Sequence, residues 1–273
     1  TKGQVNIGLK DKDSHWIGNY ADTVGYGVTQ GSLGAVNIKM KDGAFWKGFG
    51  NGSMNIEMTG KRTYWHGFSI VEKMQLSLKD GSTWYNAITP EQTNQSGKAA
   101  HAKISWLTSD NGVIDMVGRN VFVATSTSLN GQTTAENPSG IVESENGVTG
   151  NVEIKNYSGN TTVIYKHEIK DDEERENAAL YGNKAANIIG GTLTVEKAAA
   201  DSFITLRTDN EGLNTASEKA ADKNLVSETL NKLANKLYYK SYNEQPDKLE
   251  GTVEIAEGLT ASSAALKTGK ITF

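Results

Sequence analysis

Carboxylate side chains are the groups in this 273-residue chain that most directly suggest chemistry, because paired carboxylates hydrolyse glycosidic bonds. Asp42 and Asp80 hold similar positions in two similar segments, and Thr59 takes that position in the segment between them. Two strand spacings would separate the two carboxyl groups by about 9–10 Å, close to the separation of an inverting pair. The competing interpretation is that each Asp-Gly pair forms a tight turn. Asp110 and Asp115 can be interpreted in the same two ways, as catalytic carboxylates or as structural residues.

Histidine, glycine and acidic motifs do not match the spacing of an established site. His15, His66, His101 and His167 are dispersed along the chain, so we expect each to be an isolated surface side chain. His167-Glu168 lacks the second histidine of a zinc-protease helix, and the chain has no Gly-x-Ser-x-Gly nucleophile elbow. Asp11-Lys12-Asp13 lacks the glycine and terminal glutamate of a calcium loop.

A glycine cluster and an acidic run also do not match an established binding site. Gly25-Tyr26-Gly27 with Gly31 misses the dinucleotide-binding spacing. The run 171–176 predicts a solvated loop, with binding of a cation or a basic partner as the alternative. We therefore expect no catalytic, cofactor-binding or metal-binding residue and no cofactor, and the ligand-binding residues stay unknown.

A repeated unit indicates the elements that carry these residues. In each unit apolar and polar residues alternate, a turn containing glycine follows, and then comes a tryptophan. Trp46, Trp65 and Trp84 recur at intervals of 19 residues, and Ile38, Ile56, Leu76 and Ile104 serve as the apolar anchors of the units. Alternation of period two predicts strands with one buried face, and short strands of this kind need stacked neighbours to bury it. The sequence therefore predicts an all-β, right-handed parallel β-helix.

The tryptophans allow two interpretations. Stacked on the outside of the rod, Trp46, Trp65 and Trp84 would form a platform for sugar rings. Stacked in the interior or at a corner, they would form a column that every coil shares and that buries a large apolar area. We favour packing over sugar binding.

The repeat predicts three regions along the chain. Residues 1–215 are expected to form the parallel β-helix, with loop insertions at 88–101, 125–146 and 166–187. Residues 216–245 are expected to hold an amphipathic helix, because Ala216–Tyr242 contains no Gly or Pro and carries apolar residues at helical spacing. Ser217 and Asp222 are candidate caps, and we expect this helix to pack on the flank of the rod. Residues 246–273 return to strands and form the final coils.

Composition narrows the classes of function. The chain contains no cysteine, which excludes thiolate metal sites and thiol catalysis and suits export in an unfolded state. A net charge of −4 with dispersed lysines gives no basic face for nucleic acid. No apolar run approaches the ~20 residues of a transmembrane helix.

The repeat resembles the coils of autotransporter (type V secretion) passenger domains. The resemblance is carried by the units from Ile38 to Trp46 and from Leu76 to Trp84, by 190–213, and by the stretches 230–239 and 256–262. Those last two stretches resemble β-helix surface adhesins of anaerobic diderm bacteria. The family implies an N-terminal signal and a C-terminal outer-membrane barrel, so we expect both termini here to be boundaries within a longer protein.

The resemblance predicts a secreted adhesion rod on the bacterial cell surface, anchored in the outer membrane in its full-length form and not an enzyme. Its expected partners are a surface protein or glycan of a host cell or of another bacterium. Two alternatives stay open. One is a β-helix hydrolase or lyase acting on polysaccharides. The other is a subunit that assembles end to end, because open sheet edges are templates for pairing.

Overall fold

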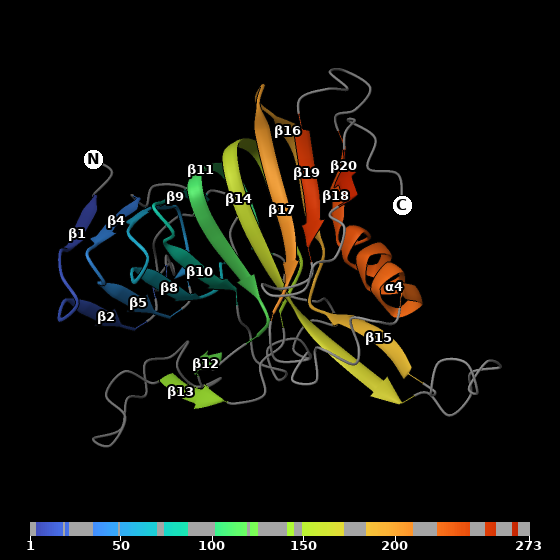
Figure 1. The fold of residues 1–273 in the computed structure, drawn as a ribbon. Helices are drawn as coiled ribbons and strands as arrows, with labels where there is room; N and C mark the ends of the chain where they lie inside the picture. Colours follow the sequence, from blue (N-terminus) through green and yellow to red (C-terminus); the bar gives the residue numbers. More distant parts are fainter. Residues whose placement is uncertain are drawn as a thin grey trace, which may run out of the picture.

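The computed structural model describes most of the chain as stacked parallel strands (Figure 1). The described residues are 4–18, 20–21, 35–48, 50–69, 74–86, 102–118, 121–124, 141–144, 149–171, 184–209, 223–240, 249–254 and 264–266. Sixteen strands join in one sheet that folds back on itself, so that its two halves lie against each other around a shared interior. The predicted all-β parallel solenoid is confirmed at this level.

One half of the sheet, here called the Asn face, contains the first strand of each coil. Its parallel strands are β1 (Val5–Leu9), β4 (Val36–Lys41), β7 (Met54–Thr59), β9 (Met74–Lys79), the start of β11 (Ala102–Met116), the start of β14 (Val152–Asp171), β16 (Leu193–Ala198) and β18 (Leu237–Tyr239). Along β4 the alternating residues Val36, Ile38 and Met40 are buried. The period-two pattern in the sequence therefore produces one buried and one outward face on each strand.

The other half, here called the Trp face, contains the second strand of each coil. Its strands are β2 (His15–Ile17), β5 (Phe45–Lys47), β8 (Tyr64–Gly67), β10 (Thr83–Asn86), the ends of β11 and β14, β17 (Ser202–Thr208) and β19 (Leu249–Glu254), and all these pairings are parallel. The short β20 (Ala264–Leu266) then pairs with β19 in the antiparallel sense. A narrow third side is formed where β3 (Tyr20–Ala21) pairs with β6 (Gly50–Asn51).

The four tryptophans of the Trp face form an interior column. Successive indole rings lie 4.8, 5.1 and 5.1 Å apart and are nearly parallel. Trp46, Trp65 and Trp84 are completely buried, whereas the first member of the column, Trp16, is only partly buried. The interpretation of Trp46, Trp65 and Trp84 as packing residues is confirmed, because these three rings have no exposed surface on which a sugar could stack.

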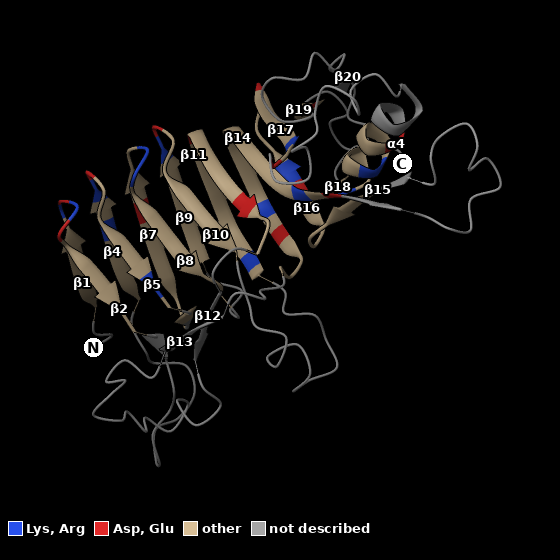
Figure 2. Ribbon diagram, turned by 60° about the horizontal axis from the view of Figure 1, so that its bottom comes forward, with Lys and Arg blue, Asp and Glu red and all other residues tan. Residues whose placement is uncertain are grey.

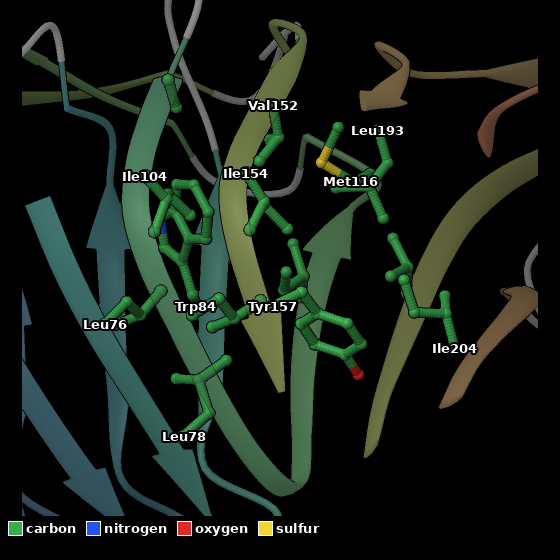
Figure 3. Close-up of a cluster of buried hydrophobic side chains, with 14 of the residues drawn as sticks. Leu76, Leu78, Trp84, Ile104, Met116, Val152, Ile154, Tyr157, Leu193 and Ile204 are labelled. Atoms are coloured by element: carbon green, nitrogen blue, oxygen red, sulfur yellow. The ribbon is translucent and has the colours of Figure 1, made fainter. Parts of the chain in front are cut away.

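Aliphatic side chains continue the column past the last tryptophan. Trp84 is in register with Ile114, which pairs with Val163, and Leu206 and Val253 follow in the next two coils. Figure 3 shows Trp84 among the buried side chains of the neighbouring strands. On the Asn face the anchors Ile38, Ile56 and Leu76 are in register as predicted. The prediction that Ile104 continues this column is wrong. Ile104 lies opposite Met74, and after a register shift between Ile104 and Trp106 it is Leu107 that pairs with Leu76.

Two of the predicted loops contain antiparallel strands. β12 (Val121–Ala124) pairs antiparallel with β13 (Ile141–Ser144), which lies within the predicted loop 125–146. The predicted loop at 166–187 is in part an antiparallel arm, in which the end of β14 pairs with β15 (Lys184–Ile189). The predicted loop at 88–101 lies outside the described residues.

The predicted helix ends earlier than expected. α4 spans Lys223–Ala234, and residues 216–222, with the candidate caps Ser217 and Asp222, lie outside the described part. After the turn at 235–236 the chain forms β18, in which Leu237 and Tyr239 are buried and Tyr238 is half exposed. Leu237 fits both the helical spacing of Leu230 and Leu233 and the alternation of a strand, and pairing with β16 decides in favour of the strand. α4 contacts β15, β17 and β19.

Glycines beside the tryptophans allow neighbouring coils to approach closely. The indole Nε1–H groups of Trp46, Trp65 and Trp84 donate to the carbonyl oxygens of Gly18, Gly48 and Gly67 in the preceding coil, each at 2.9 Å. A Cβ atom at position 48 would lie 2.0 Å from the Gly18 carbonyl oxygen. Position 48 also has a φ of 152°, which side chains other than glycine rarely adopt.

The Gly48→Ala substitution is expected to lower the free energy of unfolding by about 1–3 kcal/mol, because the backbone of the preceding coil must shift to make room. The matched control is Gly8→Ala on β1, where an added Cβ meets no atom within 4 Å. Urea denaturation of both variants measures the difference. Equal stability of the two variants would show that the close approach of the coils does not constrain position 48.

Candidate functional site

The Asp-Gly pairs lie at the corner between the two faces and adopt turn conformations. Asp42 and Asp80 have φ angles of 55° and 53°, in the left-handed region that Asp, Asn and Gly tolerate best. Register places Gly60 between them and Asn111 after them, and Thr59 pairs with Lys41 and Lys79 instead. The prediction that Thr59 is equivalent to Asp42 and Asp80 is therefore wrong by one residue. These positions share backbone geometry, which explains why they alternate among Asp, Gly and Asn.

The remaining carboxylates do not join Asp42 or Asp80 in one site. Asp110 is exposed at the end of the Asn-face part of β11. Asp115 is 6% exposed on the other part of β11, and its Oδ1 accepts a hydrogen bond from the Val117 backbone N–H at 2.8 Å. Figure 2 shows charged residues of the N-terminal coils at the turns between the faces. Turn formation thus accounts for the placement of Asp42 and Asp80, and backbone bonding accounts for Asp115.

Two of the four histidines contradict the expectation of isolated surface side chains. His15 is exposed and stacks on Phe45, and His101 lies outside the described residues. His66 is only 6% exposed and His167 only 2% exposed. β12 lies against β8, which carries His66, and α4 lies against β15, the partner of the strand that carries His167. For His167, the covering element is α4, which is distant in sequence and whose Thr229 Oγ1 lies 3.2 Å from the imidazole.

His167 belongs to a buried polar cluster that sequence analysis missed. Its Nε2 lies 3.2 Å from Oγ1 of Thr229 on α4, and its backbone N–H donates to Oδ1 of Asp209 at 2.8 Å. Asp209 follows β17, and its own backbone N–H donates to the Tyr165 carbonyl oxygen at 2.7 Å. No sequence motif connects positions 167, 209 and 229, because the three residues come from separate elements.

Hydroxyl, imidazole and carboxylate groups also make up nucleophilic triads. The His167 cluster contains all three groups, but its burial and geometry do not suit catalysis. Thr229 is 1% exposed and Asp209 is 3% exposed, which leaves no surface for a substrate to reach the hydroxyl. Moreover, Asp209 binds the backbone of His167 through its Oδ1, whereas a triad carboxylate orients the imidazole ring. The cluster instead ties the β14–β15 arm, the end of β17 and α4 together where the arm leaves the stack.

Three further titratable groups, Lys236, Tyr157 and Tyr165, also have structural roles. Lys236 Nζ donates to the Gly190 carbonyl oxygen at 2.6 Å and lies 5.8 Å from the centre of the Tyr165 ring. Desolvation lowers the pKa of Lys236 below its ordinary value. Burial raises the pKa values of Tyr157 and Tyr165, so both phenols stay neutral at physiological pH. Tyr157 donates to the Phe203 carbonyl oxygen at 2.7 Å.

The outward side of the Trp face carries a stack of aromatic rings, here called the aromatic stripe and formed by His15, Phe45 and Tyr64. Neighbouring ring centres are 5.0 Å apart, with interplanar angles of 7° and 2°. His15 is exposed, and Phe45 and Tyr64 are half-buried. Ile17, which is 41% exposed, and Lys47 lie in the adjacent outward column. Lys47 Nζ lies 5.3 Å from the centre of the Phe45 ring.

The stacking geometry limits what the aromatic stripe can bind. Each ring of the stripe faces its neighbour along the rod, so the rings turn their edges toward solvent. A sugar ring that stacks on an aromatic face finds both faces of Phe45 covered by His15 and Tyr64. A flat apolar strip of ring edges beside one cation instead suits an extended partner that lies along the rod. Sequence analysis identified the tryptophans but missed this stripe, because its residue types differ from coil to coil.

The outward side of the Asn face is polar. Asn55 Nδ2 donates to Asn37 Oδ1, and Asn37 Nδ2 donates to Asn6 Oδ1, both at 2.7 Å. Lys39 and Glu57 form an exposed ion pair at 3.0 Å in the next outward column. The two outward faces therefore differ in chemistry, with amides on one and aromatic edges on the other.

Among the described ranges there is no group of three or more His, Asp or Glu residues that could hold a metal ion. No helix in the described part of the chain has the length and apolar character required to cross a bilayer. The acidic run 171–176 lies outside the described residues except for Asp171, the last residue of β14. No protein family, curated protein or solved structure matches this chain.

Replacement of Asp80 separates a turn role from a chemical one. Asp80→Gly and Asp80→Asn are expected to leave the free energy of unfolding within about 0.5 kcal/mol of the wild type. Asp80→Val is expected to cost about 1–2 kcal/mol, because a β-branched side chain is disfavoured at positive φ. Thermal denaturation of the three variants measures this order. A large loss of stability in Asp80→Asn would contradict the turn assignment.

Thr229→Val tests the structural role of the His167 cluster. The isosteric change removes the hydroxyl next to His167 Nε2 and is expected to cost about 1–3 kcal/mol of unfolding free energy, because a hydrogen-bonding contact inside the protein is lost. The control is Thr205→Val, which removes only a half-buried contact of 3.4 Å with Thr252 and should change stability by less than about 0.5 kcal/mol. An equal loss of unfolding free energy in both variants would show that the His167 cluster does not stabilise the arm junction.

Proposed function

We propose that this chain is a segment of an autotransporter passenger domain, a secreted rod that acts at the bacterial cell surface by adhesion. It binds a surface protein or glycan of a host cell or of another bacterium and leaves that partner chemically unchanged. The resemblance of the coil sequences supports this proposal, and the stacked parallel strands are compatible with it. In the full-length protein, a barrel in the outer membrane anchors the rod. The passenger itself stays outside the membrane and binds no nucleic acid.

The finer features of the fold belong to the same proposal. We infer a right-handed winding, because a strand that returns parallel to its predecessor in one sheet almost always does so by a right-handed connection. The amphipathic helix inserted near the C-terminal end packs on the flank of the rod, in line with the contacts of α4 to β15, β17 and β19. The absence of cysteine suits passage through the cell envelope in an unfolded state.

The observation that carries the proposal is the outward aromatic stripe. Aromatic side chains in core positions support the fold, but His15, Phe45 and Tyr64 point out of the coils and keep part of their surface exposed. Aromatic side chains are enriched where proteins bind one another. Together with Ile17 and Lys47, the stripe forms a contact surface that extends along the rod and needs no enclosed pocket. Binding along such a surface is the activity expected of an adhesin.

The stripe variant Phe45→Ser/Tyr64→Ser is expected to weaken binding to target cells or to the recognised glycan at least about ten-fold, or about 1.4 kcal/mol. A glycan array and the adhesion of protein-coated beads to epithelial and bacterial cells measure binding, and the same samples are assayed for new reducing ends or unsaturated sugars. The matched control, Lys39→Ser/Glu57→Ser on the Asn face, removes an exposed ion pair and is expected to bind like the wild type.

Thermal denaturation of both double variants distinguishes lost binding from lost folding. Because the ring stack contributes some stability, the milder variant Lys47→Ala, which leaves all three rings in place, is measured as well and is expected to weaken binding by a smaller factor. Unchanged binding by the folded stripe variant would exclude the stripe as the binding surface. Release of sugar products would overturn the proposal and favour a polysaccharide hydrolase or lyase.

A further inference from the structure

One tryptophan lies outside the interior column. Trp106, in the Asn-face part of β11, is 53% exposed, whereas Trp46, Trp65 and Trp84 are completely buried. β11 lies between β9 and β14 in the middle of the stack (Figure 1), so described strands flank Trp106 on both sides. The surroundings of Trp106 therefore do not depend on how the stack continues at either end of the chain.

A β-bulge positions Trp106 in the outward column of amides. The register between β9 and β11 skips Ser105, so that Trp106 pairs with Gln75. Ser105 and Trp106 both stay outside the core, although they are consecutive residues. Asn156 Nδ2 in the next coil donates to the Ser105 carbonyl oxygen at 2.9 Å, which gives the bulged backbone a partner. Bulges often re-aim a side chain next to a functional site, and this bulge places an indole ring among amides.

Uncharged polar side chains surround Trp106 on the outward surface. They are Gln75 and Asn156 in its own column and Ser77, Thr108 and Ser158 in the next column. Gln75 and Thr108 are exposed, and within the described part of the chain their side chains form no hydrogen bond. Both side chains can therefore form hydrogen bonds with a ligand that lies over the indole ring.

Charge around Trp106 favours an uncharged ligand. The two columns that carry the amides and hydroxyls hold no charged side chain in β9, in the Asn-face part of β11 before Asp110, or in the facing part of β14. On the other side of the bulge Lys103 is in register with Glu153, so that their opposite charges offset each other. Lys155, next to the bulge, is exposed and borders the patch.

An exposed indole beside amides and hydroxyls has the chemistry of a sugar site. The C–H groups on one face of a sugar ring pack on an indole, and the hydroxyl groups around the ring form hydrogen bonds with amide and hydroxyl side chains. The rings of the aromatic stripe cover each other's faces. Trp106 has no ring neighbour among the described residues, and more than half of its surface is open, so it offers a ring face.

The amide ladder extends this patch along the rod. Gln75 is in register with Asn55, which donates to Asn37 in the coil before. A chain of sugars that stacks on Trp106 can therefore continue over a row of hydrogen-bonding side chains, one in each coil. A single sugar would use only the part of this row next to the indole.

We propose that Trp106, Gln75 and Thr108 form a binding site for an uncharged glycan chain on the Asn face. One sugar ring stacks on Trp106, Gln75 and Thr108 form hydrogen bonds with its hydroxyl groups, and the chain runs along the amide ladder. Asn156 holds the bulge that positions the indole. The site lies on the outward face opposite the aromatic stripe, and it stands whether or not the proposed adhesion does.

Iodide quenching of tryptophan fluorescence tests whether the indole is open and whether a glycan covers it. Iodide is expected to quench the wild type more than Trp106→Phe, because Trp46, Trp65 and Trp84 are completely buried. Cellohexaose, xylohexaose, mannohexaose and chitohexaose are then titrated to millimolar concentration, with hexagalacturonic acid as the charged probe. At least one neutral hexasaccharide is expected to protect the wild type from iodide in a saturable manner. Equal quenching of the two proteins, or protection by the acidic probe alone or by none of the probes, would overturn the proposal.

Titration calorimetry with the hexasaccharide that protects best assigns the residues. Trp106→Ala is expected to weaken binding at least about ten-fold, and Gln75→Leu about three-fold or more, because one hydrogen-bonding group is lost. The matched control is Lys155→Gln, which changes an exposed residue at the border of the patch and is expected to bind like the wild type. Wild-type affinity in Trp106→Ala would overturn the proposal, as would a larger loss in Lys155→Gln than in Trp106→Ala.

Two further measurements separate this site from folding and from the proposed adhesion. Thermal denaturation of Trp106→Ala is expected to match the wild type, since Trp106 is largely exposed. The stripe variant Phe45→Ser/Tyr64→Ser is expected to give the same hexasaccharide titration as the wild type, whatever its effect on adhesion to cells. Loss of the hexasaccharide in a folded stripe variant would place the glycan on the stripe and overturn the site at Trp106.

Discussion

The stability of the whole structure depends on the register between successive coils. Each coil is too thin to enclose a core, so its inward side chains are buried only by the coils above and below it. Trp46 illustrates this dependence: its ring lies between Trp16 and Trp65, and its N–H binds a carbonyl of the preceding coil. A shift of register by one residue would turn every inward side chain toward solvent. The apolar columns, the hydrogen bonds and the glycines therefore all favour a single alignment.

The strict sequence repeat is confined to the N-terminal coils. The later coils bury a continuous interior column with other residue types and longer strands. Beyond Trp84 the column continues with Ile114, Val163 and Leu206, and the short strands merge into β11 and β14, which run through both faces. The end of β14 leaves the stack to pair with β15, and α4 covers this arm. Burial at the junction is partly polar, with His167, Thr229 and Asp209 hydrogen-bonded across three elements. The rod thus carries a distinct packing region near its C-terminal end.

The residues that suggested catalysis in the sequence have structural roles in the fold. Residues that suggested hydrolysis in the sequence have backbone roles: Asp42 and Asp80 form turns at positive φ, and Asp115 binds the backbone N–H of Val117. The triad-like set around His167 is enclosed. Partly exposed aromatic side chains, in contrast, lie in a line on the outward side of the Trp face.

The sequence by itself determined the parallel stacked architecture, the interior position of Trp46, Trp65 and Trp84 and the turn role of the Asp-Gly pairs, because each depends on a short-range pattern of alternation or backbone conformation. Only the tertiary structure decided which residues are covered by distant segments. His66 and His167 look like surface residues in the sequence but are buried, His167 against α4. Leu237 fits a helix in the sequence, and pairing with β16 makes it part of a strand. The pairing of Leu76 with Leu107 likewise required the register shift in β11. Burial and pairing are set by contacts between residues far apart in the chain, and a local pattern of residue types does not contain that information.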